Sequence, residues 1–339
     1  MMLFIDPLYI LLGIIGYIFM FFIASFIAPK VASKFAGKFS LFASMIILAS
    51  SILIVSGTII YLALAYAEVY IDFTLLVVFV FISNLLIYLI SPFMINLSYG
   101  AKQDNKLQEI VDEVAKKLKV KKKFKAMRVE MPPNAFAYGN FLTGRFVAVS
   151  TSLANMVDRE ELEAIIGHEI GHHKHRDVAI MLIFGILPSI IYYLGYSMIR
   201  SSFWRRGNEE RKGSSLFLIG FLLVLASFFV QILVLAFSRL REYYADYEGA
   251  KATNKRAMQS ALVRIYNFYY ETPMALRAIQ SDRFRTLFIH SLVNALASPY
   301  VSVEDIERIK KSEVSSIQEF LSTHPPIPKR LRSLDLASL

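Results

Sequence analysis

Long stretches without a charged residue alternate with strongly charged stretches along this chain of 339 residues. Five stretches contain no Asp, Glu, Lys or Arg: residues 8–29, 39–67, 73–101, 178–199 and 213–238. Each is at least as long as the roughly 20 residues that a helix needs to cross the hydrocarbon core of a bilayer. None shows the strict alternation of a barrel strand. The pattern therefore predicts five membrane helices.

Two details of these stretches affect their interpretation. The first stretch is too long for the apolar part of a signal peptide and has no basic residues before it, so we expect a retained anchor. Pro92 and Pro188 fall inside the third and fourth stretches. A proline is tolerated within a membrane helix where neighbouring groups satisfy the carbonyl that it frees.

Between the third and fourth stretches, residues 102–177 are predicted to form a compact soluble part. Residues 106–118 have helical spacing, and residues 145–150 are typical of a short strand. The apolar face of the helix consists of Leu107, Ile110, Val111, Val114 and Leu118. Asp158 and Glu161 form a capping-box pattern, which predicts a helix that runs to about Lys174.

Composition separates the chain into two phases. Hydrophobic residues make up 55% and charged residues 19% of the whole chain, with a mean hydropathy of +0.48. These values exclude an ordinary soluble protein and a disordered one. All charged residues lie outside the five stretches, where their share is that of a soluble enzyme. The chain has no cysteine, so any metal ligand or nucleophile must come from histidine, carboxylate or hydroxyl groups.

The charges of the short loops predict an orientation. Lys30, Lys34 and Lys38 lie between the first two stretches, and Glu68 and Asp72 lie between the second and third. The positive-inside rule then places the lysine loop, and with it the basic segment 102–128, in the cytoplasm. That segment suits a face near anionic lipid headgroups, and no motif for nucleic-acid binding accompanies it.

The loop 200–215 is also basic and does not fit this orientation. If the last two stretches both cross the bilayer, this loop lies outside, against the rule. Two explanations stay open. Either the first three helices dominate the orientation, or the last two stretches form a hairpin that does not cross fully.

The strongest chemical motif is His168-Glu169-Ile170-Gly171-His172. On a helix, residues four apart share a face, so His168 and His172 can offer two imidazoles to one ion. Zinc suits nitrogen ligands, and Glu169 is placed to take a proton from a water molecule at the metal. The alternative is that these are ordinary surface residues of a helix.

A catalytic zinc site needs a third protein ligand. The metzincin extension would require glycine at 175 and histidine at 178, but the chain has His175 and Val178. Glu242 follows the last apolar stretch and is a candidate third ligand. Asp246 lies one helical turn later, where its carboxylate can accept the outer N–H of a ligand histidine.

These residues resemble those of HtpX-type membrane zinc metalloproteases, which are relatives of the CAAX prenyl proteases. The resemblance covers about 131–332 and rests on four motifs in this order: Asn134–Gly139, His168–His172, Glu242 with Asp246, and Thr323-His324-Pro325-Pro326 with Arg330. It implies one Zn²⁺ per chain, held by His168, His172 and Glu242, with Glu169 as general base. It also implies cleavage of misfolded membrane proteins on the cytoplasmic side. Three apolar stretches precede the domain here, where bacterial relatives usually have two.

The resemblance also suggests residues that bind substrate. In similar enzymes the segment that contains Asn134, Ala135 and Phe136 lies along the cleft and pairs with an extended substrate. The alternative for Asn134 is a turn residue after two prolines. His324 and Arg330 are expected to bind substrate or an oxyanion, or to form a structural cap. We expect His173 and His175 to be solvated or lipid-facing and His290 to be packed, rather than metal ligands.

The sequence thus predicts a mainly helical, multi-pass protein of the cell membrane with a cytosolic gluzincin-type zinc endopeptidase domain that contains a small sheet. Residues 1–101 and 178–238 form its membrane regions, and residues 102–177 and 239–339 its protease parts. Its partners are membrane protein or peptide substrates and the lipid bilayer; none is a nucleic acid. A prenyl-protein (CAAX) endopeptidase is one alternative. The other is a non-catalytic metal-binding scaffold or transporter, although no charge lies inside a predicted span.

Overall fold

The computed structural model of the protein describes residues 55–56, 59, 72–204, 210–271, 302–314 and 324–337. The predicted membrane segment 8–29, nearly all of 39–67, and His290 therefore lie outside the described residues. The described residues fall into two units. One contains residues 55–56, 59, 72–85, 181–204 and 210–237, and the other contains 86–180, 238–271, 302–314 and 324–337.

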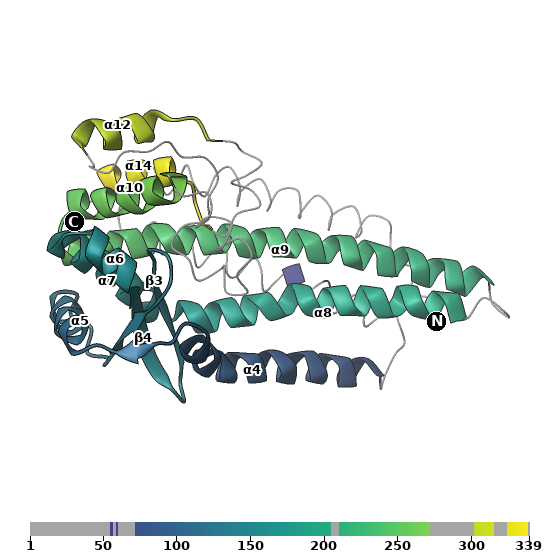
Figure 1. Cartoon of the computed structure of the whole chain (residues 1–339). Coiled ribbons are helices and arrows are strands. Elements are labelled where there is room, and N and C mark those ends of the chain that lie inside the picture. The colour runs from purple at the N-terminus through teal and green to yellow at the C-terminus, as the bar shows by residue number, and fades with distance from the viewer. Residues whose placement is uncertain are drawn as a thin grey trace. The chain divides into compact units, whose positions relative to one another are not determined.

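Long apolar helices make up the first unit (Figure 1). They belong to α4 (Asp72–Ser98), α8 (Asp177–Trp204) and α9 (Glu210–Ala252), all of which continue into the second unit. Ile180–Phe203 and Ser215–Ala252 are long and apolar enough to cross a membrane. Gly195 and Gly220 let α8 and α9 pack closely, because a Cβ at Gly195 would lie 2.6 Å from the Gly220 carbonyl oxygen.

Helix α9 is longer than the apolar pattern predicts. The charge-free stretch ends at Ser238, but the helix continues without a break to Ala252. Its 43 residues are about 64 Å long, twice the thickness of a hydrocarbon core. Glu242 and Asp246 thus lie on the same helix as the predicted membrane segment, rather than on a separate one.

A four-stranded mixed sheet lies in the second unit, with the order β1–β2–β4–β3. The strands are β1 (Lys102–Gln103), β2 (Lys125–Val129), β3 (Ala135–Asn140) and β4 (Gly144–Ser150). β2 and β4 are parallel, and the other two pairs are antiparallel. The predicted strand 145–150 is confirmed as β4, whereas the other three strands were not predicted.

Both faces of the sheet are covered. Alternate side chains such as Val147 and Val149 join a core with the helices of the second unit. These helices are α5 (Asn105–Lys117), α6 (Thr151–Met156), α7 (Arg159–Lys174), α10 (Lys255–Glu271), α12 (Val303–Lys311) and α14 (Ile327–Leu336). The intervening side chains, such as Phe136 and Phe146, pack against Ile95 and Tyr99 at the end of α4.

The two helices predicted in residues 102–177 are confirmed. All five apolar residues of the first are buried in α5 or directly after it. In α7 the capping box is complete: the Asp158 carboxylate accepts from the Glu161 amide at 2.9 Å, and Glu161 accepts from the Asp158 amide at 3.0 Å. The chain then turns at Arg176, which has a φ of +59°, and α8 begins at Asp177.

Candidate metal centre

Helices α7 and α9 approach each other closely because small residues line their contact. A Cβ placed on Gly167 would lie 2.6 Å from the Cβ of Ala252. A Cβ on Gly249 would lie 2.6 Å from the carbonyl oxygen of Ala164. Neither position leaves room for a side chain, so the two backbones can pack with their functional groups facing one another.

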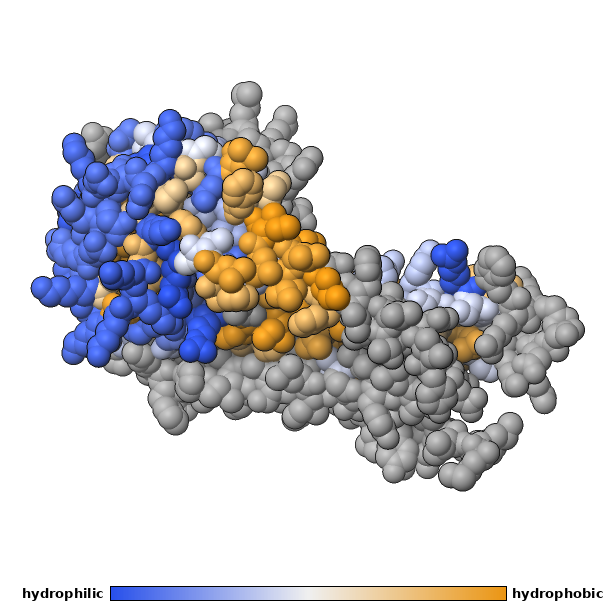
Figure 2. Space-filling view, turned by 90° about the horizontal axis from the view of Figure 1, so that it is seen from below, coloured by the Kyte–Doolittle hydropathy of each residue, from blue (hydrophilic) through white to orange (hydrophobic). Residues whose placement is uncertain are grey.

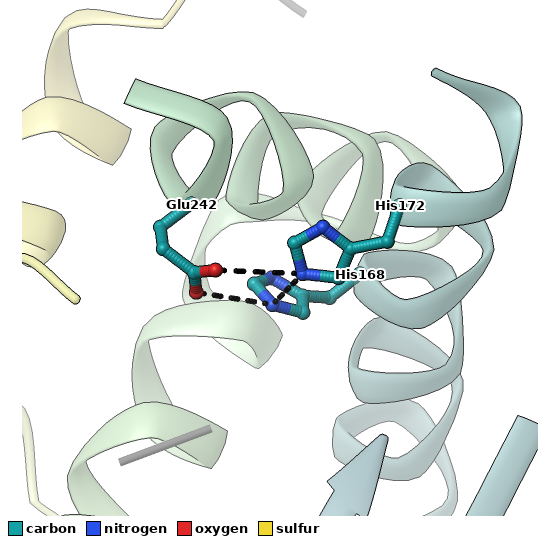
Figure 3. Close-up of side chains that lie close together, drawn as sticks. All are labelled: His168, His172 and Glu242. Carbon is teal, nitrogen blue, oxygen red and sulfur yellow. Dashed lines mark hydrogen bonds and ion pairs between the residues drawn. The ribbon is translucent and has the colours of Figure 1, made fainter. Parts of the chain in front are cut away.

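This packing brings together the three residues that were predicted as zinc ligands (Figure 3). The Nε2 atoms of His168 and His172 are 3.2 Å apart, and each lies 3.6 Å from an oxygen of the Glu242 carboxylate. Ligand atoms of a tetrahedral zinc ion at ordinary bond lengths are separated by about 3.3–3.5 Å. All three side chains are buried, and Glu242 Oε2 has no hydrogen-bond partner among the described residues. The donor set therefore fits a zinc ion.

The outer nitrogen of His168 faces a buried acid. Its Nδ1 lies 3.0 Å from Asp246 Oδ1, as expected for a carboxylate that orients a ligand histidine. Asp246 accepts two hydrogen bonds in turn from the Arg330 guanidinium, at 2.8 and 2.5 Å. Arg330 is completely buried and also lies 3.8 Å from Glu242 Oε2. Arg330 is therefore placed to hold the two acids of α9 in position.

The outer nitrogen of His172 has an equivalent partner that sequence reasoning missed. Because Nε2 of this ring faces the cluster, Nδ1 carries the proton and donates to Asp177 Oδ2 at 2.7 Å. Arg241 Nε lies 3.1 Å from the same oxygen. Burial disfavours the charged form of Asp177, but the charge of Arg241 and the hydrogen bond from His172 outweigh it and lower the pKa of this carboxyl. A signal was available, since each ligand histidine needs an acceptor and Asp177 follows His172 by five residues.

Glu169 lies beside the cluster without belonging to it. Its carboxylate is buried and accepts a hydrogen bond from the backbone N–H of Ala137 in β3. Burial is the main cause that raises the pKa of Glu169, to about 7. A divalent cation at the cluster would favour the carboxylate and lower this pKa. The side chain is thus suited to both accept and release a proton.

Strand β3 is the outermost strand of the sheet among the described residues, and its Ala137 lies at Glu169. The Ser150 amide donates to the Asn134 carbonyl at 2.9 Å, and the Asn134 amide donates to the Ser150 hydroxyl at 2.9 Å, so hydrogen bonds join these two residues directly across the strands. Because such pairs alternate along antiparallel strands, Ala135, Ala137 and Gly139 direct their backbone groups away from β4. The Ala137 contact with Glu169 agrees with this arrangement. Asn134, Ala135 and Phe136 themselves are buried.

The C-terminal motif also reaches the cluster. His324 Nε2 lies 3.6 Å from Glu242 Oε1. Burial is the main cause that lowers the pKa of His324, to about 4, although the Glu242 charge opposes it. A ring with this pKa is neutral near pH 7 and keeps one N–H to donate.

The two remaining histidines of α7 lie away from the cluster. His173 is buried rather than solvated, since its Nε2 lies 2.8 Å from the Phe146 carbonyl oxygen and its ring contacts Phe124. His175 is half-buried against the Tyr244 ring. The expectation that they are not ligands of this cluster agrees with these positions, but the predicted exposure of His173 is wrong.

Comparison with known proteins identifies the family. The sequence model of peptidase family M48 matches residues 101–337, which is more than half of the chain. The chain belongs to peptidase family M48. The matched region contains every residue of the cluster, and membership identifies the chain as a peptidase.

Relatives within family M48 cover nearly the whole chain. A "Protease HtpX homolog" of Archaeoglobus fulgidus is 59% identical over 99% of this chain and 98% of its own length. A protein of the same description from Pyrobaculum aerophilum is 53% identical over 97% of both chains. A crystal structure of Ste24p from S. mikatae matches with a TM-score of 0.48 and 22% identity, covering 88% of this chain and 67% of that chain. The family match and the two HtpX homologues confirm the predicted resemblance to HtpX-type proteases.

Proposed function

We propose that this chain is a zinc-dependent endopeptidase of the cell membrane that hydrolyses misfolded or damaged membrane proteins on the cytoplasmic side. The observation that carries the zinc dependence is the spacing of His168, His172 and Glu242, which matches the donor separations of a tetrahedral ion. Membership of family M48 supports peptide hydrolysis. The two helices long and apolar enough to cross a membrane support the location.

The residues around the cluster have distinct roles in this proposal. When bound, the metal supplies Lewis-acid chemistry for the scissile carbonyl and the attacking water. His168, His172 and Glu242 hold it, and Asp246, Arg330 and Asp177 orient the two rings. Glu169 takes the proton from the attacking water at its carboxylate and delivers it to the leaving amine.

The same geometry suggests how a substrate is held. An extended peptide pairs with the open edge of β3, next to the Ala137 amide that contacts Glu169. The neutral His324 ring, close to Glu242, donates to the oxygen that becomes negative during attack. Roles in substrate binding for the 134–136 segment, His324 and Arg330 stay predictions.

A metal-binding scaffold or transporter would account for the three ligands. It would not account for Glu169, a buried carboxylate beside the three ligands that accepts a hydrogen bond from the backbone of β3. The endopeptidase explains both the cluster and this acid, and we favour it for that reason.

The first prediction tests the role of Glu169. The purified protein in detergent should contain zinc and cleave casein, and the Glu169→Gln variant should retain the zinc while its cleavage rate falls roughly 10²- to 10⁴-fold. The reason is that glutamine cannot accept a proton. Metal analysis and a casein assay, each with and without chelator, measure both quantities.

Two matched variants define the result. Glu163→Gln also changes a buried acid of α7, but Glu163 pairs with Lys117 and Arg159 away from the cluster, so activity should be kept. Glu242→Ala should lose zinc as well as cleavage. Cleavage at the wild-type rate by Glu169→Gln, or an unchanged zinc content in Glu242→Ala, would contradict the proposal.

A further inference from the structure

The loop between β3 and β4 carries two large apolar side chains that its own unit does not cover. Phe141 is 74% exposed and Leu142 is 68% exposed. Single exposed apolar residues are common on proteins, but a contiguous apolar surface marks a contact with another apolar phase or partner. The position of this loop relative to α4 indicates whether lipid or another protein makes this contact.

In the same unit, α4 exposes an apolar face along three turns. Its exposed large residues are Leu86, Ile87, Ile90, Phe93, Met94 and Leu97. No charged residue occurs between Asp72 and Lys102. On the face seen in Figure 2, hydrophobic side chains gather in one orange area beside a hydrophilic blue surface. The exposed apolar face of α4 continues to Leu97. If α4 is in a bilayer, the boundary between lipid and water therefore lies near Ser98 or beyond it.

A proline fixes the β3–β4 loop to this helix. Pro92 has no N–H, so the Tyr88 carbonyl four residues earlier lacks its helical partner. Asn140, at the end of β3, donates its side-chain amide to the carbonyls of Tyr88 and Leu89, each at 3.0 Å. The Ser91 hydroxyl donates to the Tyr88 carbonyl as well, at 2.9 Å. The tip of the loop is therefore held at the level of Tyr88.

That level lies well inside the apolar part of α4. Tyr88 precedes Ser98 by ten residues, which is about 15 Å along a helix axis. The Phe141 ring is 6.5 Å from the Tyr88 ring, centre to centre. Exposed apolar side chains occur on α4 both before this level, at Ile87, and after it, at Phe93 and Leu97. Lipid that covers α4 would therefore also cover the tip of the loop.

The backbone of the loop is suited to such surroundings. A lipid phase offers no water to unpaired backbone groups, so non-helical backbone is tolerated there only when its polar groups are paired. The Asn140 side-chain oxygen accepts from the amides of Leu142 and Thr143, at 3.0 and 2.9 Å, and from the Thr143 hydroxyl at 3.1 Å. Asn140 itself is only 6% exposed. The Asn140 side chain thus pairs with two amides of the turn and with two carbonyls of α4.

Basic residues lie at the base of this apolar loop. Arg145 lies opposite Gly139 in the sheet, in the residue pair next to the one that closes the loop. Burial lowers the pKa of the Lys122 side chain, and the charges of Arg145 and Arg176 lower it further. A long arginine side chain can bury its apolar stem and direct its charge to the phosphates of anionic lipids. A loop that enters a bilayer surface is expected to have apolar residues at its tip and basic residues nearer to the strands that it connects.

We propose that the β3–β4 loop inserts Phe141 and Leu142 into the lipid bilayer, with Asn140 and Pro92 fixing it to α4. This inference rests on the membrane location proposed above. Strand β3 then runs from the lipid to the Ala137 amide at Glu169.

The absence of cysteine makes a direct test possible. Single cysteines at Leu142, Leu97 and Leu336 are labelled with an environment-sensitive fluorophore in the Glu169→Gln background. Leu336 is the matched control, an exposed leucine at the end of α14, away from this loop. The proteins are placed in nanodiscs of phosphatidylcholine and phosphatidylglycerol, and quenching by nitroxide-labelled acyl chains is compared with quenching by aqueous iodide. A second label, at Phe141, guards against a local effect of one substitution.

The labels at Leu142, Phe141 and Leu97 should be quenched by the nitroxide lipids and shielded from iodide several-fold relative to the label at Leu336. Iodide quenching at Leu142 and Phe141 equal to that at Leu336 would overturn the proposal. Shielding from iodide without lipid quenching would mean that protein covers the loop, and would also overturn it. Neither readout needs catalysis, so failure here is distinct from failure of the proposed peptidase activity.

Discussion

The His172 ring is oriented by the Asp177 carboxylate, which lies on the side of the ring away from the metal position. The Arg241 guanidinium contacts that carboxylate. Asp177 accepts from His172 Nδ1, and Arg241 lies against the same oxygen. This chain of contacts fixes both the tautomer and the orientation of the ring, so that Nε2 faces the metal position. Asp177 touches neither substrate nor reacting atoms, and its role is to position His172.

Replacing Asp177 with asparagine should weaken zinc binding about 10- to 100-fold, the range found when such partners of ligand histidines are changed. Asparagine keeps the shape but presents a weaker acceptor, and it removes the acid that lies 3.1 Å from Arg241 Nε. Competition with a chromogenic chelator measures the affinity of the purified protein. Glu163→Gln should bind zinc like the wild type; an Asp177→Asn protein that binds equally tightly would show that the contact does not position the ring.

Several of these residues could be read from the sequence and others could not. His168, Glu169 and His172 follow from spacing on one helix, because helical periodicity is a local property. Glu242 and Asp246 needed the additional inference that the chain returns to the same membrane face. The Ala137 amide could not be found, since a backbone donor at an open strand edge has no signature in residue types.

Among the elements, α7 and α9 owe their close contact to positions without side chains. Gly167 faces Ala252, and Gly249 faces the backbone of Ala164. A methyl group at either glycine would push the helices apart. Because His168 and His172 are on one helix and Glu242 is on the other, such a shift would also widen the cluster.

Gly167→Ala should therefore destabilise the protein by about 1–3 kcal/mol and lower its affinity for zinc. Gly185→Ala is the matched control, since a Cβ at that position of α8 meets nothing within 4 Å. In a helix the control should gain up to about 1 kcal/mol. Thermal melting in detergent, with and without zinc, checks both. Equal melting temperatures for the two variants would refute the packing explanation.

The elements also differ in how far the sequence predicts them. Helix α5 was predicted within a residue at each end because its five apolar residues recur at helical intervals and are all buried. Strand β3 was not predicted as a strand, because Ala, Gly and Asn make up much of it and these residues are depleted in strands. The parallel pairing of β2 with β4 joins segments about 20 residues apart, and no local pattern specifies it.

At the scale of the whole molecule, the orientation in the bilayer is still a prediction from charge. The basic segment around Lys121 is exposed and should face the cytoplasm. Ser201, near the end of α8, should lie on the opposite side if α8 and α9 both cross. It should lie on the same side as Lys121 if they form a hairpin that does not cross.

Single cysteines at these two positions answer the question, because the natural chain has none. A membrane-impermeant maleimide applied to intact cells should not label Lys121→Cys, whereas the same reagent should label it in inverted vesicles. Labelling of Ser201→Cys in intact cells would show that α8 and α9 cross. Labelling of Lys121→Cys from outside would contradict the predicted orientation and the cytoplasmic placement of the peptidase.

The contact between Asn140 and the Tyr88 carbonyl joins two segments that synthesis produces at different times. The two residues are 52 positions apart, and synthesis produces α4 before the β3–β4 hairpin. Until Asn140 emerges, the carbonyl freed by Pro92 has the Ser91 hydroxyl as its local donor. The β3–β4 hairpin then supplies this carbonyl with a second donor, in addition to the Ser91 hydroxyl. The bond that joins the sheet to the helix can therefore form only after residues 52 positions further along the chain have been made.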